Sequence, residues 1–263
     1  MTMITTRAPA YAVESVDSAL KILRMLCDVK DLRVSEVAER LGVAQSTAHR
    51  LLSMLVHHGF AVQDGRGREY RTGPMLLEMG FAAIRDMEVR QHARPILEQV
   101  RDKVNETVHL GIPYGQEVLY VECVESRRQL RIASRVGAFL PAHCVGLGKA
   151  LLATLSKEEL HNLYPVKELR FLTDRSLRSR DELERQLERV RRLGYAKSRG
   201  ESDEGVASLA IAVLDRRGVG RAAISISAPV FRVTPDLLPV WLEAVRTAAA
   251  AIGARLWGRP GVV

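Results

Sequence analysis

The residues from Val34 to Leu52, VSEVAERLGVAQSTAHRLL, constrain the fold of this chain more than any other segment. Two short amphipathic stretches meet there within a few residues, with Gly42 between them and the small residue Ala38 one turn earlier. Helices that cross through so short a turn need a small residue at their contact and a turn residue that tolerates positive φ. The spacing predicts one helix that ends at Gly42 and another that begins at Gln45 or Ser46.

A further helix is expected before this pair, because apolar residues share one face: Val16, Leu20, Leu23, Met25 and Leu26. Ser15 or Asp17 is expected to cap the N-terminus of this helix, and Ser35 is expected to cap that of the second helix. The third helix is expected to stop at Gly59. Its inner face is formed by Ala48, Leu51, Leu52 and Leu55.

The exposed side of the third helix is polar and contains no acid at its start. An acidic side chain there would be repelled by DNA phosphates, whereas Gln, Ser, Thr, His and Arg side chains donate hydrogen bonds to phosphates or base edges. The residues expected to contact DNA from the two helices are Ser35, Gln45, Ser46, Thr47, His49 and Arg50. Taken alone, the pattern also fits an ordinary helical hairpin.

The segment FAVQDGRGREYRTG, residues 60–73, favours DNA binding over that alternative. It has an apolar strand start, a DGRG turn and an arginine-rich return strand, which is typical of a β-hairpin. Such a hairpin forms a wing beside a recognition helix, and it carries Arg66, Arg68 and Arg71 toward the DNA backbone or minor groove. The net charge of +8 agrees with a polyanionic partner, although the basic clusters further along are more typical of a solvated face.

The remainder of the chain alternates helical and extended patterns. A linker helix is expected over residues 74–90, which either bridges two domains and helps to pair two chains or is a plain core helix. A second helix is expected with Pro95 in its first turn. The strands expected after it are TVHLGIP, EVLYVECV, LRIASRV, YAKS, VASLAIAVL and AAISIS. Because helices interrupt them, the pattern predicts a mixed sheet with helices packed on it.

Six stretches of the chain occur in a characteristic order: VDSALKILRML, VSEVAERLGVAQSTAHRLLSMLVHHGF, YRTGPMLLEMG, PAHCVGLGKALLA, GYAKSRGESDEGVASLAIAVLD and AAISISAP. Together they resemble the IclR family of bacterial transcriptional regulators, from about Val13 to Trp257. The resemblance implies an α+β multidomain protein, in which a winged helix-turn-helix domain (residues 11–73) precedes the linker helix. An α/β effector-binding domain similar to GAF and PAS modules follows over residues 91–258. Residues 1–10 begin like a cloning-vector leader and are set aside as a leader or vector-derived segment.

The resemblance also implies partners and a function. Members of the family assemble as homodimers or homotetramers and bind palindromic operators in double-stranded DNA, where they repress or activate. We therefore expect a ligand-responsive DNA-binding regulator, with repression the favoured mode, whose DNA affinity is controlled by a small-molecule effector. An enzyme that acts on a small molecule in the larger domain is the alternative, and a purely oligomeric scaffold is another.

The serines of the last strands suggest where an effector binds. Ser225 and Ser227 point to one face of a strand, and Ser208 lies in the strand before it. Inward hydroxyl groups need a polar ligand, a buried water or a backbone partner. The resemblance implies an effector pocket lined by Gly146, Leu147, Ser198, Val206, Ser208, Ser225 and Ser227, with Gln129 and Ile132 near its mouth or wall.

Three residues depart from the family's pattern. Ser198 stands where an acid is frequent, Ser208 where a cysteine is frequent and Ala212 where a proline is common. Without a carboxylate at position 198, the pocket repels an anionic effector less. The departures favour a small organic or aromatic acid as the effector, and they leave a neutral amide or hydrazide open.

The stretch GLGKALLA is not a phosphate-binding loop. A Walker loop needs a glycine at the position of His143 and Ser or Thr at that of Ala150. Gly146 and Gly148 precede a helix expected from Lys149 to Leu155, whose first N–H groups could hold a small anion such as a carboxylate.

No metal, cofactor or catalytic residue is expected. The residues that could suggest one are His109, Cys123, His143 and Cys144, and they match neither a structural zinc spacing nor an acid-oriented triad. The three cysteines form no CxxC pair, which fits a reducing compartment. No apolar run approaches the roughly 18 residues that span a bilayer, and no signal peptide is visible, so the sequence indicates a cytoplasmic protein without a membrane partner.

Overall fold

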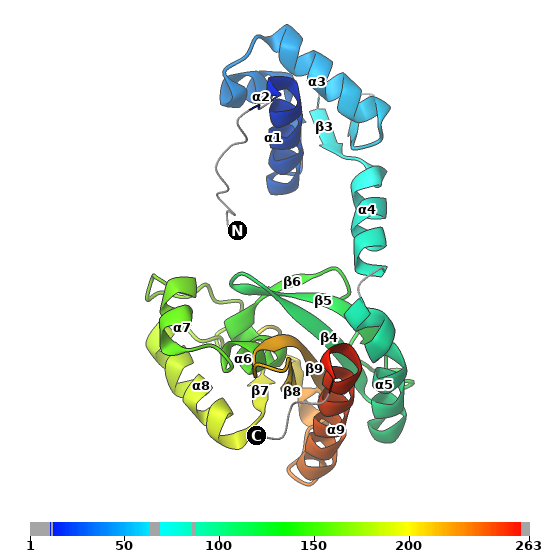
Figure 1. Ribbon diagram of the computed structural model, residues 1–263, viewed down its shortest axis with the longest axis vertical. Coiled ribbons are helices and arrows are strands. Elements are labelled where there is room, and N and C mark those ends of the chain that lie inside the picture. The colour runs from blue at the N-terminus through cyan, green and yellow to red at the C-terminus, as the bar shows by residue number, and fades with distance from the viewer. Residues whose placement is uncertain (1–10, 12, 64–68, 86–87, 259–263) are drawn as a thin grey trace. The chain divides into compact units, whose positions relative to one another are not determined.

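The computed structural model describes residues 11, 13–63, 69–85 and 88–258, and the side chains of residues 81–85 are not described (Figure 1). The chain divides into two compact units between residues 85 and 86.

The N-terminal unit packs three helices on a small antiparallel sheet. The helices are α1 (Glu14–Asp28), α2 (Val34–Leu41) and α3 (Gln45–His57), and α4 (Pro74–Arg85) follows them. The strands are β1 (Leu32–Arg33), β2 (Ala61–Gln63) and β3 (Glu69–Thr72), in the order β1-β3-β2. Apolar side chains from all three helices meet in one core: Ile22, Leu26, Val37, Ala48, Leu52 and Leu55. The predicted start of the third helix and the paired strands of the hairpin are confirmed.

The left-handed turn at Gly42 is confirmed as well, with φ of 68°. The predicted caps are wrong. α1 begins at Glu14, and its N-cap residue Val13 makes no side-chain hydrogen bond. Ser35 lies inside α2, whose start is stabilised instead by Glu36, since its carboxylate accepts a 2.8 Å hydrogen bond from the Arg33 backbone N–H.

The apolar face predicted for the first helix is only partly correct. Leu26 is buried, but Val16 and Leu20 are more than half exposed. Ile22 takes the central place in the core instead and is completely buried. The stripe that contacts the other helices therefore runs through positions 22 and 26.

The C-terminal unit is built on a six-stranded sheet in the order β6-β5-β4-β9-β8-β7. Its strands are β4 (Thr107–Tyr114), β5 (Glu117–Val124), β6 (Phe139–Pro141), β7 (Ala196–Arg199), β8 (Val206–Leu214) and β9 (Gly220–Pro229). All neighbouring strands of this described sheet are antiparallel, so the predicted mixed sheet is wrong. Short hairpins join β4 to β5 and β8 to β9, and such connections impose antiparallel pairing.

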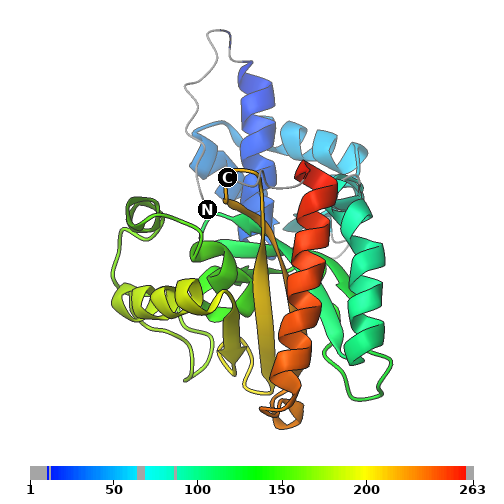
Figure 2. The ribbon, with the colours of Figure 1, turned by 60° about the horizontal axis from the view of Figure 1, so that its bottom comes forward.

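Helices cover both faces of the sheet. One face carries α5 (Glu88–Val104) and α9 (Leu237–Trp257), which lie side by side (Figure 2). The other face carries α6 (Gly146–Leu152), with α7 (Lys157–Leu163) and α8 (Arg180–Leu193) beyond it. Two short 3-10 turns complete the unit, η1 (Ala142–Cys144) before α6 and η2 (Val230–Arg232) before α9.

Three local expectations in this unit are wrong. α5 already begins at Glu88, so Pro95 lies inside it and not in its first turn. Residues 130–136 form an irregular loop and not a strand, because the Glu125 carboxylate takes up the Ser134 backbone N–H at 2.9 Å. α6 begins at Gly146, three residues early, and Gly148 packs so tightly on Ala142 that any Cβ would collide with its backbone.

Helix α9 corrects the expectation about apolar runs. By length and composition it could cross a membrane, with a mean hydropathy of 1.3. In the structure it packs against α5 and β8, and 39% of its apolar window is buried. One side of α9 is therefore buried against α5 and the sheet, and the remainder is exposed.

Candidate functional sites

The first residues of α3 offer a polar surface. Five of them have exposed side chains: Gln45, Ser46, Thr47, His49 and Arg50. Ala48 lies between them and is completely buried, as is Leu52 one turn further on. The first turn contains no acidic residue. The start of α3 thus buries Ala48 and Leu52 in the core of its unit and presents hydrogen-bonding side chains outward, as recognition in a major groove requires.

The other predicted DNA contacts differ in their surroundings. Ser35 is exposed near the start of α2, so its hydroxyl is free to meet a partner. Arg71 on β3 forms an ion pair with Asp31, which compensates part of its charge. Arg66 and Arg68 lie outside the described residues. The contacts of all these residues with DNA stay predictions.

Hydroxyl side chains form a row across four strands of the C-terminal sheet. Ser198 of β7 pairs with Ser208 of β8, which pairs in turn with Ser227 of β9. Thr107 of β4 is the partner of Ser227 on its other side. Paired residues share a face of the sheet, and Ser225 joins that face from two residues before Ser227. These five residues are named the hydroxyl row.

α6 lies directly over this row. A Cβ atom on Gly146 would lie only 2.7 Å from Ser208 Oγ, so a side chain there would press on the hydroxyl. Leu147 is buried on the same face but reaches toward Gly111 of β4. Val206 is half-buried, two residues before Ser208 on its strand. The structure therefore brings three of the residues predicted for the effector pocket to the face of the row: Gly146, Leu147 and Val206.

The hydroxyl groups of the row are only partly satisfied by the protein. Ser198 Oγ donates to the Cys144 carbonyl at 3.3 Å, and Ser227 Oγ lies 3.4 Å from His109 Nδ1. Among the described residues, the side chains of Ser208 and Ser225 form no hydrogen bond with the protein, and neither Oγ atom is one of the fully buried atoms that lack a partner. Two hydroxyl groups thus stay available to a ligand or to water.

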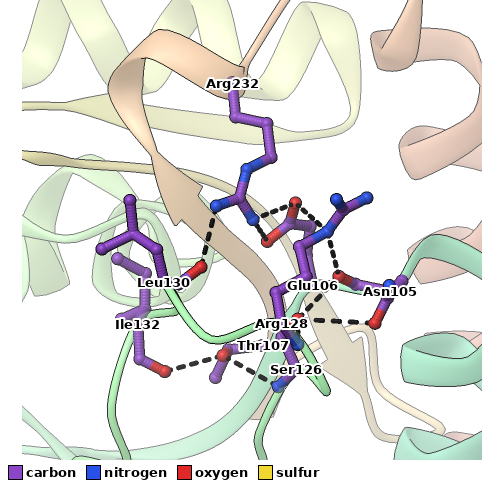
Figure 3. Close-up of polar contacts among 8 residues, drawn as sticks. All are labelled: Asn105, Glu106, Thr107, Ser126, Arg128, Leu130, Ile132 and Arg232. Atoms are coloured by element: carbon purple, nitrogen blue, oxygen red, sulfur yellow. Dashed lines mark hydrogen bonds and ion pairs between the residues drawn. The ribbon is translucent and has the colours of Figure 1, made fainter.

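The loop between β5 and β6 is fastened at the Thr107 end of the row (Figure 3). Thr107 Oγ1 donates to the Ile132 carbonyl at 2.7 Å, and Arg232 Nη2 donates to the Leu130 carbonyl at 2.8 Å. Glu106, which is 2% exposed, accepts from Arg232 Nη1 at 2.8 and 2.9 Å. We name the Glu106, Arg232 and Leu130 contacts the loop clasp.

The two loop residues predicted for the pocket have different places. The backbone of Ile132 lies against the row through Thr107. Gln129 is exposed, and its carbonyl accepts from Arg131 Nη1 at 3.4 Å, which gives it no direct link to the row. The structure brings the first residue to the site and leaves the second on the surface.

A cavity of about 290 Å³ reaches Ser198 and Ser208. Leu238 and Trp241 of α9 also line it, whereas Gly146, Ser225 and Ser227 do not. A larger cavity of about 490 Å³ lies between α8 and β7 and contains none of the predicted effector residues. The hydroxyl row is therefore defined better by strand register and packing than by an open cavity.

The cysteines and histidines of this unit lack the properties of a nucleophilic pair. Burial raises the pKa of the Cys144 thiol and raises that of Cys123 to about 11, so both are protonated at neutral pH and react slowly. His143 Nε2 donates to the Arg170 carbonyl at 2.7 Å. Within the described residues, no group of three His, Cys, Asp or Glu side chains could hold a metal ion.

Sequence reasoning missed the main buried ion pair of the unit. Lys149 Nζ lies 2.7 Å from both carboxylate oxygens of Glu201, and Lys149 is completely buried. It also missed the loop clasp and the place of His109 beside the row. The period-two pattern of β4, with Thr107 and His109 two residues apart, was the one available signal for His109.

A winged helix-turn-helix unit, joined in one chain to an α/β unit with a row of hydroxyl groups under a helix, is typical of a ligand-responsive DNA-binding regulator. Comparison with protein families agrees with this class. Residues 15–65 match the IclR helix-turn-helix domain, and residues 81–254 match the bacterial transcriptional regulator IclR C-terminal domain. The chain belongs to the IclR family of transcriptional regulators, with a DNA-binding helix-turn-helix domain and a C-terminal effector-binding domain.

Individual relatives cover almost the whole chain. The regulator XynR of Escherichia coli is 31% identical over 93% of this chain and 97% of its own length. The transcriptional repressor IclR of the same species is 30% identical over 87% of this chain and 85% of its own.

A solved structure is similar as well. An IclR homologue from Microbacterium hydrocarbonoxydans, complexed with 4-hydroxybenzoate, is 26% identical, with a TM-score of 0.69 over 92% of this chain and 98% of its own. The named relatives are transcriptional regulators, so the alternative of an enzyme is not favoured.

Proposed function

We propose that the protein is a repressor whose affinity for its operator is controlled by a small organic or aromatic acid bound at the hydroxyl row. The observation that carries this proposal is the pair of unpartnered hydroxyl groups of Ser208 and Ser225 on the face beneath α6. Neither Oγ atom is among the fully buried side-chain atoms that lack a partner, so both hydroxyl groups can reach water or a polar ligand. A polar ligand would supply the missing partners, so these residues, and not a catalytic group, form the site.

The class of effector follows from the charges around the row. Ser198 supplies a hydroxyl where a carboxylate would repel an anion, and hydroxyl groups donate to carboxylate oxygens. The 4-hydroxybenzoate complex of the Microbacterium homologue supports an aromatic acid. A neutral amide or hydrazide is the competing ligand.

The operator is double-stranded DNA, and we propose that it is palindromic and bound by a homodimer or homotetramer in the bacterial cytoplasm. Leu77 and Met79 on α4 are more than half exposed, which supports a role for α4, within the linker predicted over residues 74–90, in pairing two chains. The linker would join the domains predicted over residues 11–73 and 91–258. Paired recognition helices would meet half-sites about 34 Å apart or a multiple of that distance.

Thermodynamic linkage relates effector binding to DNA binding. An effector that prefers one arrangement of the chains changes DNA affinity by the same coupling free energy, typically about 1 to 3 kcal/mol. DNA binding therefore weakens, by about 5- to 150-fold, when the acid saturates the row.

A gel-shift titration tests the proposal. The DNA upstream of the neighbouring genes is titrated with full-length protein at modest salt, against a scrambled fragment of equal length. Benzoate, 4-hydroxybenzoate and 4-hydroxybenzamide are then added in separate series. We expect a sequence-preferring complex that the acids release and the amide does not. A complex without sequence preference contradicts the assignment, and recovery of chemically altered ligand would favour the enzyme.

A further inference from the structure

His109 lies beside the hydroxyl row, although it is not among the residues predicted for the effector site. In the register of β4 and β9 it pairs with Ser225, and it follows Thr107 by two residues. Both relations put its side chain on the face of the row. His109 is therefore a direct neighbour of an unpartnered hydroxyl group.

The imidazole ring is buried but only half satisfied. It is 1% exposed, and it packs edge-on against Tyr120 with ring centroids 5.3 Å apart. Nδ1 lies 3.4 Å from Ser227 Oγ. Nε2 is buried and has no hydrogen-bond partner among the described residues. A buried polar atom without a partner is rare in folded proteins, because it loses its bond to water and gains nothing in return.

The ring is also neutral, which fixes what Nε2 can do. Burial and, to a lesser extent, the positive charge of Arg135 lower the pKa of His109 from 6.5 to about 4. A weak hydrogen bond with the backbone of Ala133 and the negative charge of Glu125 oppose this shift without reversing it. A neutral imidazole has one donor and one acceptor nitrogen. When Nδ1 accepts from the Ser227 hydroxyl, the proton resides on Nε2, which makes no hydrogen bond of normal geometry although the backbone of Ala133 lies close enough to act on the ring.

The acceptor that suits this place is an anionic oxygen. Hydrogen bonds from a neutral N–H to a carboxylate are stronger than those to a neutral oxygen. Arg135 adds positive potential at the ring, as the lowered pKa of His109 shows. Arg135 lies 3.4 Å from Ser202 Oγ and 3.7 Å from Asp203 Oδ2, and it also acts on the Tyr120 hydroxyl group. Such surroundings favour an acid over an amide.

The loop that the clasp fastens covers this place. Ile132 is held by Thr107, and the neighbouring Ala133 acts on the ring of His109 through its backbone. The ring of His109 therefore lies beside residues 132–133, in a loop that has no helix or strand between residues 125 and 138. For an oxygen of a ligand to bond Nε2, it must take the place of the Ala133 backbone beside the ring.

We propose that His109 contacts the effector and that its Nε2–H donates a hydrogen bond to the carboxylate of a small organic acid. This inference rests on the proposed function of the hydroxyl row and names one further residue of that site. The acid carboxylate then replaces the missing partner of Nε2, while the hydroxyl groups of Ser208 and Ser225 bind the same ligand.

The test compares three replacements of His109 in the full-length protein. His109→Gln keeps an N–H donor near the place of Nε2, His109→Asn keeps a polar group only near Nδ1, and His109→Leu removes both. Calorimetric titration with 4-hydroxybenzoate and benzoate gives the dissociation constants. We expect affinity to fall about tenfold or more in the Leu and Asn variants and to stay within about threefold in the Gln variant, as loss of one charge-assisted hydrogen bond predicts. His161→Leu, at an exposed histidine of α7, is the matched control and should bind as the wild type does.

A second measurement separates contact from structural support. The chain has seven histidines, and the Nε2–H resonance of His109 is assigned by its loss in the Gln variant. We expect this proton to shift downfield when 4-hydroxybenzoate is added, which a residue that only supports the fold would not show. If the Leu variant does not fold, the Asn variant and this resonance decide the matter.

The outcomes distinguish the two proposals. Binding of the acids to the Leu and Asn variants as tightly as to the wild type, or an unmoved resonance, overturns the role of His109 and leaves the proposed function intact. If neither acid binds the wild-type protein, the proposed class of effector fails, and the role of His109 fails with it.

Discussion

The ammonium group of Lys149 lies 2.7 Å from both carboxylate oxygens of Glu201, in a place where neither residue is more than 8% exposed. Gln186 Oε1 accepts a third hydrogen bond from Lys149 Nζ at 3.1 Å. The lysine of the GLGK stretch is thus an internal cation that ties α6 to α8 and to the segment after β7. Its charge is used inside the protein and is not presented to a phosphate group.

Replacing Lys149 alone should destabilise the protein strongly. In Lys149→Met the Glu201 carboxylate stays buried without a counter-charge, and breaking a buried pair in this way costs about 3 to 5 kcal/mol. Equilibrium unfolding in urea measures the change. The double variant Lys149→Met/Glu201→Leu should recover most of the loss, because two apolar side chains replace the pair. Lys157→Met, at the exposed start of α7, is the control, and a loss below about 1 kcal/mol in Lys149→Met would contradict the prediction.

The sequence was sufficient for features that depend on neighbouring residues. The start of α3 at Gln45, the turn at Gly42 and five of the six expected strands follow from local periodicity and turn chemistry. The N-caps predicted for α1 and α2 were wrong, because Ser and Asp favour the N-cap position without requiring it. Glu36 stabilises the start of α2, and no side chain caps α1. The strand expected over residues 130–136 failed because side chains from elsewhere satisfy that backbone.

The site itself depends on residues far apart in the chain. His109 meets Ser227 across 118 residues, and Glu106 meets Arg232 across 126. The strand register that joins them is set by the packing of the whole sheet and has no local signature. The family pattern was therefore enough to predict the serines of the candidate site, and it gave no signal for the clasp or for the neighbouring histidine.

Acid should weaken the fold through His109. Its pKa is about 4 in the folded protein and about 6.5 when the chain is unfolded, so the unfolded chain takes up the proton first as the pH falls. The stability contributed by the neutral ring is complete above pH 6.5 and is lost progressively down to pH 4, by about 2 kcal/mol between pH 7 and pH 4.5. The free energy of unfolding is measured in urea at pH 7 and pH 4.5 for the wild type and for His109→Gln. The difference between the two proteins isolates the contribution of His109, because the other groups titrate equally in both proteins. Equal losses in the two proteins would show that His109 does not titrate in this way.

Two residues of α3 should affect DNA binding differently. Arg50→Ala should weaken binding to all sequences and lower the salt slope by about one phosphate, as loss of a backbone contact does. Gln45→Ala should relax discrimination at one base pair by about 1 to 3 kcal/mol. Binding is measured over a salt series on the operator and on single-base variants of it. Arg189→Ala, on the exposed side of α8, removes the same charge from the other unit and serves as the control. Full affinity and specificity in both α3 variants would make the assignment of the recognition helix wrong.

The loop clasp should control how readily the segment over the hydroxyl row opens. Arg232→Leu removes the bidentate contact with Glu106 and the hydrogen bond to the Leu130 carbonyl, which together anchor the loop. Hydrogen bonds to charged groups contribute about 1.5 to 3 kcal/mol each, so amide hydrogen exchange over residues 127–133 should accelerate by about tenfold or more.

Exchange measured by mass spectrometry should stay unchanged in the core strands β8 and β9, which shows that the effect is local. The matched control is Arg127→Leu, because it breaks the 3.0 Å pair with Asp102 between side chains that are 72% and 51% exposed. Such surface pairs contribute little, and exchange in this variant should equal that of the wild type. Equal exchange over residues 127–133 in Arg232→Leu and Arg127→Leu would show that the clasp does not hold the loop. Faster release of a bound acid from Arg232→Leu alone would show that opening of this segment limits ligand exit, because the clasp does not contact the ligand site itself.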